Sequence, residues 1–262
     1  MLFTTHENII FKDVWRTFGD LCARFLQTAY GLSKDSYRID FVFDTYVEGS
    51  IKDSERQRRL SCGPIDLNVI CEETPLPVSM DAFWASSANK SKLQGLLRNY
   101  VLANPRPMTE VVLSGIGFSP NIDPCLGIIN GSDPTSLPAL DLDIEEADVR
   151  IIPHALDATN CGAERVVLLS NDTDVVVLGL HHWSILTEHG LKELWIKAGV
   201  ATTTRYIPLY TLATRMGPEK CKVIIPLHQL TGCDSTSKFG TKTPALNAKP
   251  EKFFPELCQE SI

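Results

Sequence analysis

The sequence lacks the features that mark membrane, secreted and zinc-binding proteins. No apolar run approaches the roughly 18 residues of a membrane-spanning helix. The first residues, MLFTTHENIIFKD, lack the basic start and apolar stretch of a signal peptide. The eight cysteines include no C-x-x-C pair, which argues against zinc, and their scattered positions are typical of reduced thiols. We therefore expect an intracellular protein, with the nucleus as one compatible location and no membrane partner.

The chain also lacks internal repeats and low-complexity linkers. Its 262 residues, 44% of them hydrophobic and 22% charged, are enough for a sizeable core. We expect one domain over residues 1–250 and a tail at 251–262. Irregular excursions are expected at 62–80 and at 116–140, where four prolines indicate a long surface loop. The net charge of −7 argues against a general nucleic-acid binder.

Helical and strand patterns alternate along the sequence. Apolar residues at helical spacing predict a first helix within residues 8–31, ended by Gly31. The other expected helices cover residues 50–60, 89–104, 145–161 and 218–230. The expected strands cover residues 39–43, 109–115, 165–169, 174–180 and 193–197. This alternation, with strands apolar on both faces, indicates an α/β fold around a largely parallel sheet.

Two aspartates interrupt an otherwise apolar run, VVLLSNDTDVVVLGL, at residues 166–180. A carboxylate inside a buried strand is costly unless something compensates for its charge. The spacing of Asp172 and Asp174 can point both side chains to one side of an extended segment. Asp44 closes the strand pattern IDFVFD, and Asp234 lies in a turn after another apolar segment. These acids therefore fall where open α/β sheets form their sites, at the carboxyl ends of strands.

A further pair of acids precedes the helix expected at 145–161. Glu146 and Asp148 cannot face the same way inside a helix, so they converge only if they straddle its N-terminus, which favours anions. Carboxylates gathered at one point repel, and Mg²⁺ or Mn²⁺ would resolve that conflict because both prefer oxygen ligands. The alternative for any single acid is a turn former or a helix cap. Spacing alone leaves both interpretations open.

Other polar residues receive simpler interpretations. Taken by itself, the segment SIKDSERQRRL at residues 50–60 is a solvated helix whose charges pair locally. His181 and His182 are expected at a surface or interface, and His154 and His228 in the core. The segment GIINGSDPT has turn chemistry and no phosphate-loop pattern, so no nucleotide-triphosphate site is expected.

The order and spacing of the motifs resemble a known superfamily. Four motifs resemble the flap-endonuclease branch of the PIN-like nucleases: VFD with the following Lys and Arg residues, EEAD, LLSNDTDVVVL and LTGCDSTSKFGTKT. Three longer segments look more like an uncharacterised animal family of PIN-like proteins often found near mobile elements. They are RIDFVFDTYVEGSIKDSERQRR, EEADVRIIPHAL and TGCDSTSKFG. The resemblance covers about residues 14–246. It implies a three-layer α/β/α sandwich with a mainly parallel central sheet and a metal-dependent phosphodiesterase site.

The resemblance also implies roles for particular residues. A nuclease of this kind cleaves DNA or RNA with two Mg²⁺ or Mn²⁺ ions. The residues that match its metal ligands are Asp44, Glu146, Asp148, Asp172, Asp174 and Asp234, with Glu145 as an alternative to Glu146. Those that match its catalytic basic helix, which contacts the scissile phosphate, are Lys52, Arg56 and Arg59, with Arg58 as an alternative to Arg59. Those that match its nucleic-acid backbone contacts are Gly232, Ser235, Thr236, Lys238, Gly240 and Lys242.

One part of the family pattern has no match. The first strand of the PIN-like fold, which ends in another metal-binding Asp, is expected to be missing. The chain could be a fragment, residues 1–11 with their strand-like ENIIF could fill the position, or the domain could be a non-catalytic copy. An alternative function is therefore an inactive PIN-like scaffold that binds nucleic acid or protein. A hydrolase of small phosphate esters is a third possibility, which the basic helix and Gly-rich segment suit less well.

Overall fold

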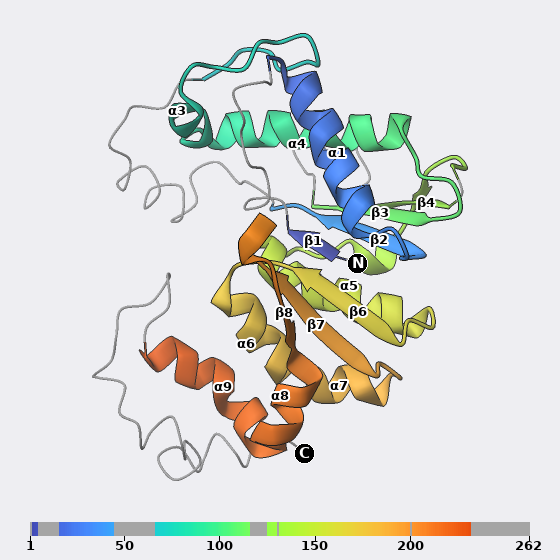
Figure 1. The fold of residues 1–262 in the computed structure, drawn as a ribbon, viewed down its shortest axis with the longest axis vertical. Coiled ribbons are helices and arrows are strands. Elements are labelled where there is room, and N and C mark those ends of the chain that lie inside the picture. The colour runs from blue at the N-terminus through green and yellow to red at the C-terminus, as the bar shows by residue number, and fades with distance from the viewer. Residues whose placement is uncertain are drawn as a thin grey trace. The chain divides into compact units, whose positions relative to one another are not determined.

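The computed structural model describes residues 2–4, 16–44, 66–115, 125–129, 131–199 and 201–231. Together they form an α/β arrangement of helices and strands (Figure 1). The chain divides into two units, Phe3–Arg150 and Ile151–Ile262, called unit 1 and unit 2 below. Among the described residues, no helix has both the length and the apolar character needed to cross a bilayer.

The first helix, α1, covers Phe18–Leu32 in unit 1. A capping box starts it, because the Thr17 hydroxyl accepts from the Asp20 amide while the Asp20 carboxylate accepts from the Thr17 amide. The predicted apolar face is confirmed from Phe18 onward, and residues 8–15 lie outside the described chain. The helix extends past Gly31 and is capped by Ser33, so the prediction that Gly31 ends it was wrong.

In the described residues, the sheet of unit 1 contains four strands. β2 (Arg38–Val42) pairs in parallel with β3 (Glu110–Ser114), and the helices α3 (Met80–Trp84) and α4 (Ser87–Ala103) connect them. β4 (Cys125–Ile129) is antiparallel to β3, and β5 (Thr135–Ser136) is antiparallel to β4. The side chain of Phe41 packs on α1, where its ring centroid lies 5.5 Å from that of Phe25.

The region expected to be a surface loop, residues 116–140, is largely structured where it is described. It contributes β4, β5 and a short 3₁₀ helix, η1 (Pro138–Leu140). Cys125 and Leu140 form a buried cluster with Val112 of β3. The prediction was wrong because prolines flank the apolar segment CLGII without entering it, so they limit the strand's length and leave its pairing intact.

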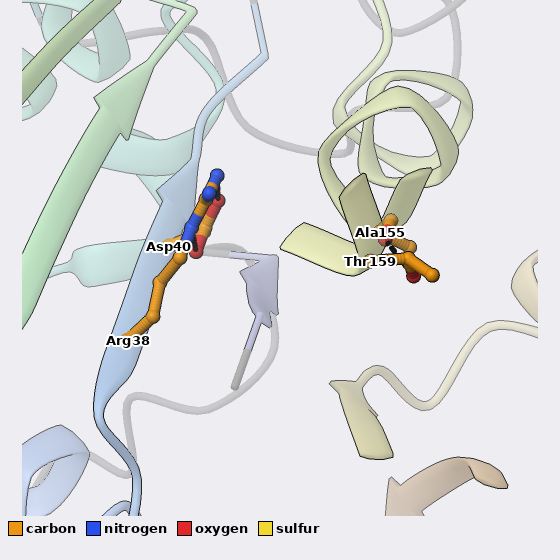
Figure 2. A network of polar contacts seen from close by, with 4 residues as sticks. All are labelled: Arg38, Asp40, Ala155 and Thr159. Carbon is orange, nitrogen blue, oxygen red and sulfur yellow. Dashed lines mark hydrogen bonds and ion pairs between the residues drawn. The ribbon is translucent and has the colours of Figure 1, made fainter. Parts of the chain in front are cut away.

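A buried ion pair lies within β2. Arg38 and Asp40 stand two residues apart, so both side chains project from the same face of the strand (Figure 2). Nε and Nη2 of Arg38 donate to the two carboxylate oxygens of Asp40 over 2.9 and 2.8 Å. The side chains are only 4% and 0% exposed. Figure 2 also shows Thr159, whose hydroxyl donates to the carbonyl of Ala155 one turn earlier in its helix.

A short strand, β1 (Leu2–Thr4), precedes α1 in the chain. The prediction that no strand precedes the first helix was therefore wrong, although β1 has only three residues and none of them is acidic. The strand-like segment ENIIF, at residues 7–11, lies outside the described residues.

The part of unit 2 that the structure describes is built around a sheet of three strands. Helix α5 (Ala147–Asn160) leads into β6 (Arg165–Leu169), and β7 (Glu193–Ala198) pairs in parallel with β6. β8 (Arg205–Pro208) is antiparallel to β7 and follows the 3₁₀ turn η2 (Ala201–Thr203). The remaining helices are α6 (Thr173–His181), α7 (Trp183–Glu188), α8 (Leu209–Met216) and α9 (Pro218–Thr231).

The segment expected to be a strand at 174–180 is the helix α6. Its buried residues are Val175, Gly179 and Leu180, a helical spacing that the consecutive valines obscure in the sequence. A Cβ on Gly179 would lie 2.5 Å from Cδ1 of Leu209, so this glycine permits the close approach of α6 and α8. Tertiary packing therefore overrides the strand preference of the valine run.

The α/β class is confirmed, and the described sheets are mixed. Of the strand pairs with a described register, β2–β3 and β6–β7 are parallel and three are antiparallel. Each unit thus has a parallel strand–helix–strand connection followed by an antiparallel neighbour. This pattern does not confirm a mainly parallel central sheet.

Candidate functional site

The acids predicted in unit 1 meet at the N-terminus of α5. Asp44 follows β2 directly, and its Oδ1 accepts a 2.8 Å hydrogen bond from the amide of Ala147, the first residue of α5. Glu146 immediately precedes that residue and Asp148 lies in the first turn. The structure therefore brings Asp44 to the helix end that carries Glu146 and Asp148, where the helix dipole favours negative charge.

An arginine that the sequence interpretation missed lies beside these acids. Arg150 is 3% exposed, and its guanidinium donates to the carbonyls of Phe43, at 2.5 Å, and of Ile144. Burial lowers the pKa of Arg150, while the charge of Asp44 acts in the opposite direction. The sequence did contain a signal for this residue, which is the arginine that ends the acidic motif EEADVR. A charged residue on the buried face of a helix requires partners, so this arginine was a candidate member of the site.

The acids predicted in unit 2 follow β6. Asp172 is the N-cap of α6, because its Oδ1 accepts a 2.8 Å hydrogen bond from the amide of Asp174. The Asp172 amide itself donates to the hydroxyl of Ser170. Asp174 lies in the first helical turn, so the expectation of two side chains on one extended segment was wrong. The helix-cap interpretation holds for Asp172.

Asp174 has a partner that was predicted to lie in the core. Nε2 of His228, on α9, donates to Oδ1 of Asp174 over 2.7 Å. The side chain of His228 is 21% exposed, so its expected core position was wrong, whereas His154 is fully buried as predicted. His181 and His182 are half-buried, and burial is the main reason that the pKa of His182 is lowered.

Further groups lie at the carboxyl ends of β6 and β7. The amide of Gly199, just after β7, donates to Oδ1 of Asn171 over 2.6 Å. The amide of Ser170 donates to the carbonyl of Lys197 at 3.3 Å. These bonds join the two parallel strands at the end that carries Asp172 and Asp174.

Several predicted site residues lie outside the described chain. They are Lys52, Arg56, Arg58, Arg59, Gly232, Asp234, Ser235, Thr236, Lys238, Gly240 and Lys242. Within the part that is described, no group of three or more His, Cys, Asp or Glu side chains is arranged to hold a metal ion. The gathering of all six predicted ligands therefore stays a prediction.

Comparison of the chain with protein-family models, curated proteins and solved structures found no match.

An ion pair between an exposed arginine and a half-buried glutamate lies at the amino ends of β6 and β7, and its titration can be measured. Arg165 binds both carboxylate oxygens of Glu193, at 2.7 and 2.9 Å, and Nε1 of Trp195 donates to the same carboxylate. The hydrogen bond from Arg165, followed by that from Trp195, lowers the pKa of Glu193 to about 2.

We expect Glu193 to titrate at about pH 2 in the folded protein, which NMR of its carboxyl carbon would measure. Because the folded pKa lies below the ordinary glutamate value of 4.5, the pair contributes stability above about pH 4.5 and loses it as the pH falls through 2. Arg165→Met should return the pKa towards 4.5. A folded-state pKa unchanged by this substitution would contradict the assignment to Arg165.

Proposed function

We propose that the chain is a divalent-metal-dependent nuclease, flap-endonuclease-like, that hydrolyses phosphodiester bonds of DNA or RNA. One observation carries the proposal. Predicted acids follow β2 and β6, each of which is the first strand of a described parallel pair. Each of these two groups of acids lies at the N-terminus of a helix. Ligand sites of α/β sheets form at this end of their strands. A PIN-like α/β/α sandwich belongs to the same proposal and is supported by the strand–helix–strand connection in each unit.

The proposed ligands are Asp44, Glu146, Asp148, Asp172, Asp174 and Asp234. Their carboxylate oxygens fit Mg²⁺ or Mn²⁺, which would activate a water and stabilise the leaving oxygen when bound. Oδ1 of Asp172 accepts the hydrogen bond that caps α6, and this bond fixes the orientation of the carboxylate. Lys52, Arg56 and Arg59 would contact the scissile phosphate, and the segment from Gly232 to Lys242 would bind the nucleic-acid backbone.

The second candidate is a PIN-like scaffold that binds nucleic acid or protein without catalysis. A specific observation favours it: the described acids already have structural partners. Asp44 and Asp172 cap helices, and Asp174 is held by His228.

Asp172→Asn is the variant that separates the two candidates. Asparagine is as good an N-cap as aspartate, so the bond from the Asp174 amide and the fold should survive while the negative charge is lost. With Mn²⁺ and labelled flap, single-stranded and duplex substrates of DNA and RNA, we expect the wild type to cleave. The variant should be slower by about 100-fold or more, since loss of a residue that only orients a ligand already costs about 10–100-fold.

Glu188→Gln is the matched control, because it removes one charge from an exposed residue at the end of α7 in the same unit. It should leave both cleavage and stability unchanged. Equal cleavage by Asp172→Asn and the wild type would refute the assigned role. If no substrate is cut and Mn²⁺ does not raise the melting temperature, the scaffold is the better description.

A further inference from the structure

One face of the unit 2 sheet combines aromatic and basic side chains. Lys197 on β7 stands directly opposite Tyr206 on β8, and Trp195 lies two residues before Lys197. Side chains alternate along a strand, so these three residues share one face of the sheet, whose three strands lie side by side in Figure 1. The opposite face of β7 carries Leu194 and Ile196, which belong to the hydrophobic core.

The aromatic residues of this face are accessible. The Tyr206 side chain is 54% exposed on β8. Trp195 is half-buried and is not part of the described core cluster that contains Leu194 and Ile196. Its ring lies edge-on to Tyr210 at a centroid distance of 5.4 Å. Its indole nitrogen donates to Glu193, which fixes the ring orientation. A rigid indole and an exposed phenol on one face offer surfaces on which a planar ring can stack.

Lys197 is the unusual member of this face. It is only 8% exposed, and no carboxylate of the described residues forms an ion pair with it. Its ammonium nitrogen is not among the described polar atoms that are fully buried without a hydrogen-bond partner. Burial lowers the pKa of Lys197, with no charged neighbour acting on it. Keeping a cation here costs stability, and an anionic ligand would offset that cost.

We infer that Trp195, Lys197 and Tyr206 bind a single strand of nucleic acid, with bases stacked on the aromatic rings and a phosphate on the lysine. Sequence-tolerant binding of single strands uses this combination of aromatic rings and a cation. The inference rests on the proposed function and specifies its substrate as single-stranded. The net charge of −7 agrees with a short local contact to few phosphates rather than a broad basic surface.

The test is fluorescence anisotropy of labelled single-stranded DNA and RNA oligonucleotides in EDTA, where cleavage by a metal enzyme cannot occur. Tyr206→Ala should weaken binding by about 10-fold, and Tyr206→Leu should do the same because it keeps apolar bulk without the ring. The matched control is Tyr37→Ala in unit 1, since that tyrosine is also 54% exposed. It should bind like the wild type.

Lys197→Met gives a readout that a structural role would not produce. It should weaken binding and reduce the slope of log K against log salt by about 0.7, the value of one phosphate on a single strand. It should also raise the melting temperature, because the cost of burying the cation disappears. Lys192→Met is the control, since Lys192 is exposed and paired with Glu164.

The outcomes separate this inference from the nuclease proposal. Binding in EDTA that depends on Tyr206 and Lys197, without cleavage in Mn²⁺, supports the single-strand site and rejects the nuclease. Single strands that do not bind, or that bind equally to the wild type, Tyr206→Ala and Lys197→Met, overturn the inference even if Asp172-dependent cleavage is found. Duplex binding that Tyr206→Ala weakens as much as it weakens single-strand binding overturns it as well, because paired bases cannot stack on the rings.

Discussion

Asp40→Asn should lower the free energy of unfolding by about 3–5 kcal/mol, the usual cost of removing one partner from a buried ion pair. The carboxylate of Asp40 is 0% exposed and accepts both hydrogen bonds of a forked pair with Arg38. An amide supplies one acceptor oxygen and no charge, so the Arg38 guanidinium stays buried without its bidentate partner. Denaturation by urea at pH 7 would measure the loss.

Two controls test whether burial is the reason. Lys192→Met breaks an ion pair in which Lys192 is 67% and Glu164 is 65% exposed. It should lower the free energy of unfolding by less than about 1 kcal/mol. The double variant Arg38→Met with Asp40→Leu should recover most of the loss, because apolar replacements of a buried pair are often neutral. An Asp40→Asn cost as small as that of Lys192→Met would contradict the prediction.

Gly115→Ala should destabilise unit 1 by about 3–5 kcal/mol, since backbone strain and overpacking each cost about 1–3 kcal/mol. Gly115 follows β3 with φ +92°, a conformation that favours glycine. An added Cβ would lie 2.0 Å from both the carbonyl oxygen of Phe43 and Nη1 of Arg150. The backbone carbonyl cannot move without breaking the bond that Arg150 donates to it.

Gly162→Ala is a matched control for this prediction. Gly162 has φ +95°, yet a Cβ there would meet nothing within 4 Å. It should therefore cost only the backbone strain, about 1–2 kcal/mol. The difference between the two variants in chemical denaturation isolates the clash with Phe43 and Arg150. Equal costs would mean that unit 1 relaxes around the new methyl group.

Elements with an unbroken local pattern were predicted within a few residues of their observed bounds. The strands β2, β3, β6 and β7 and the helices α4, α5 and α9 follow their predicted positions. Their patterns are local because the geometry of a strand or helix fixes which neighbouring residues share a face. The segments α7, β8 and α8 were not predicted, and α6 was predicted as a strand, since short or uniformly apolar runs carry no distinct period.

The sequence by itself determined that Asp44 and Asp172 follow strands, because those strand ends follow local periodicity. It also placed Glu146 and Asp148 at the start of a helix. Only the tertiary structure decided what each acid does. Asp44 caps a helix that begins 103 residues later, and Asp174 meets a histidine 54 residues away. Likewise, pairing in the sheet placed Tyr206 opposite Lys197. Such partners are chosen by long-range packing, which joins segments far apart in the sequence and leaves no periodic trace in the chain.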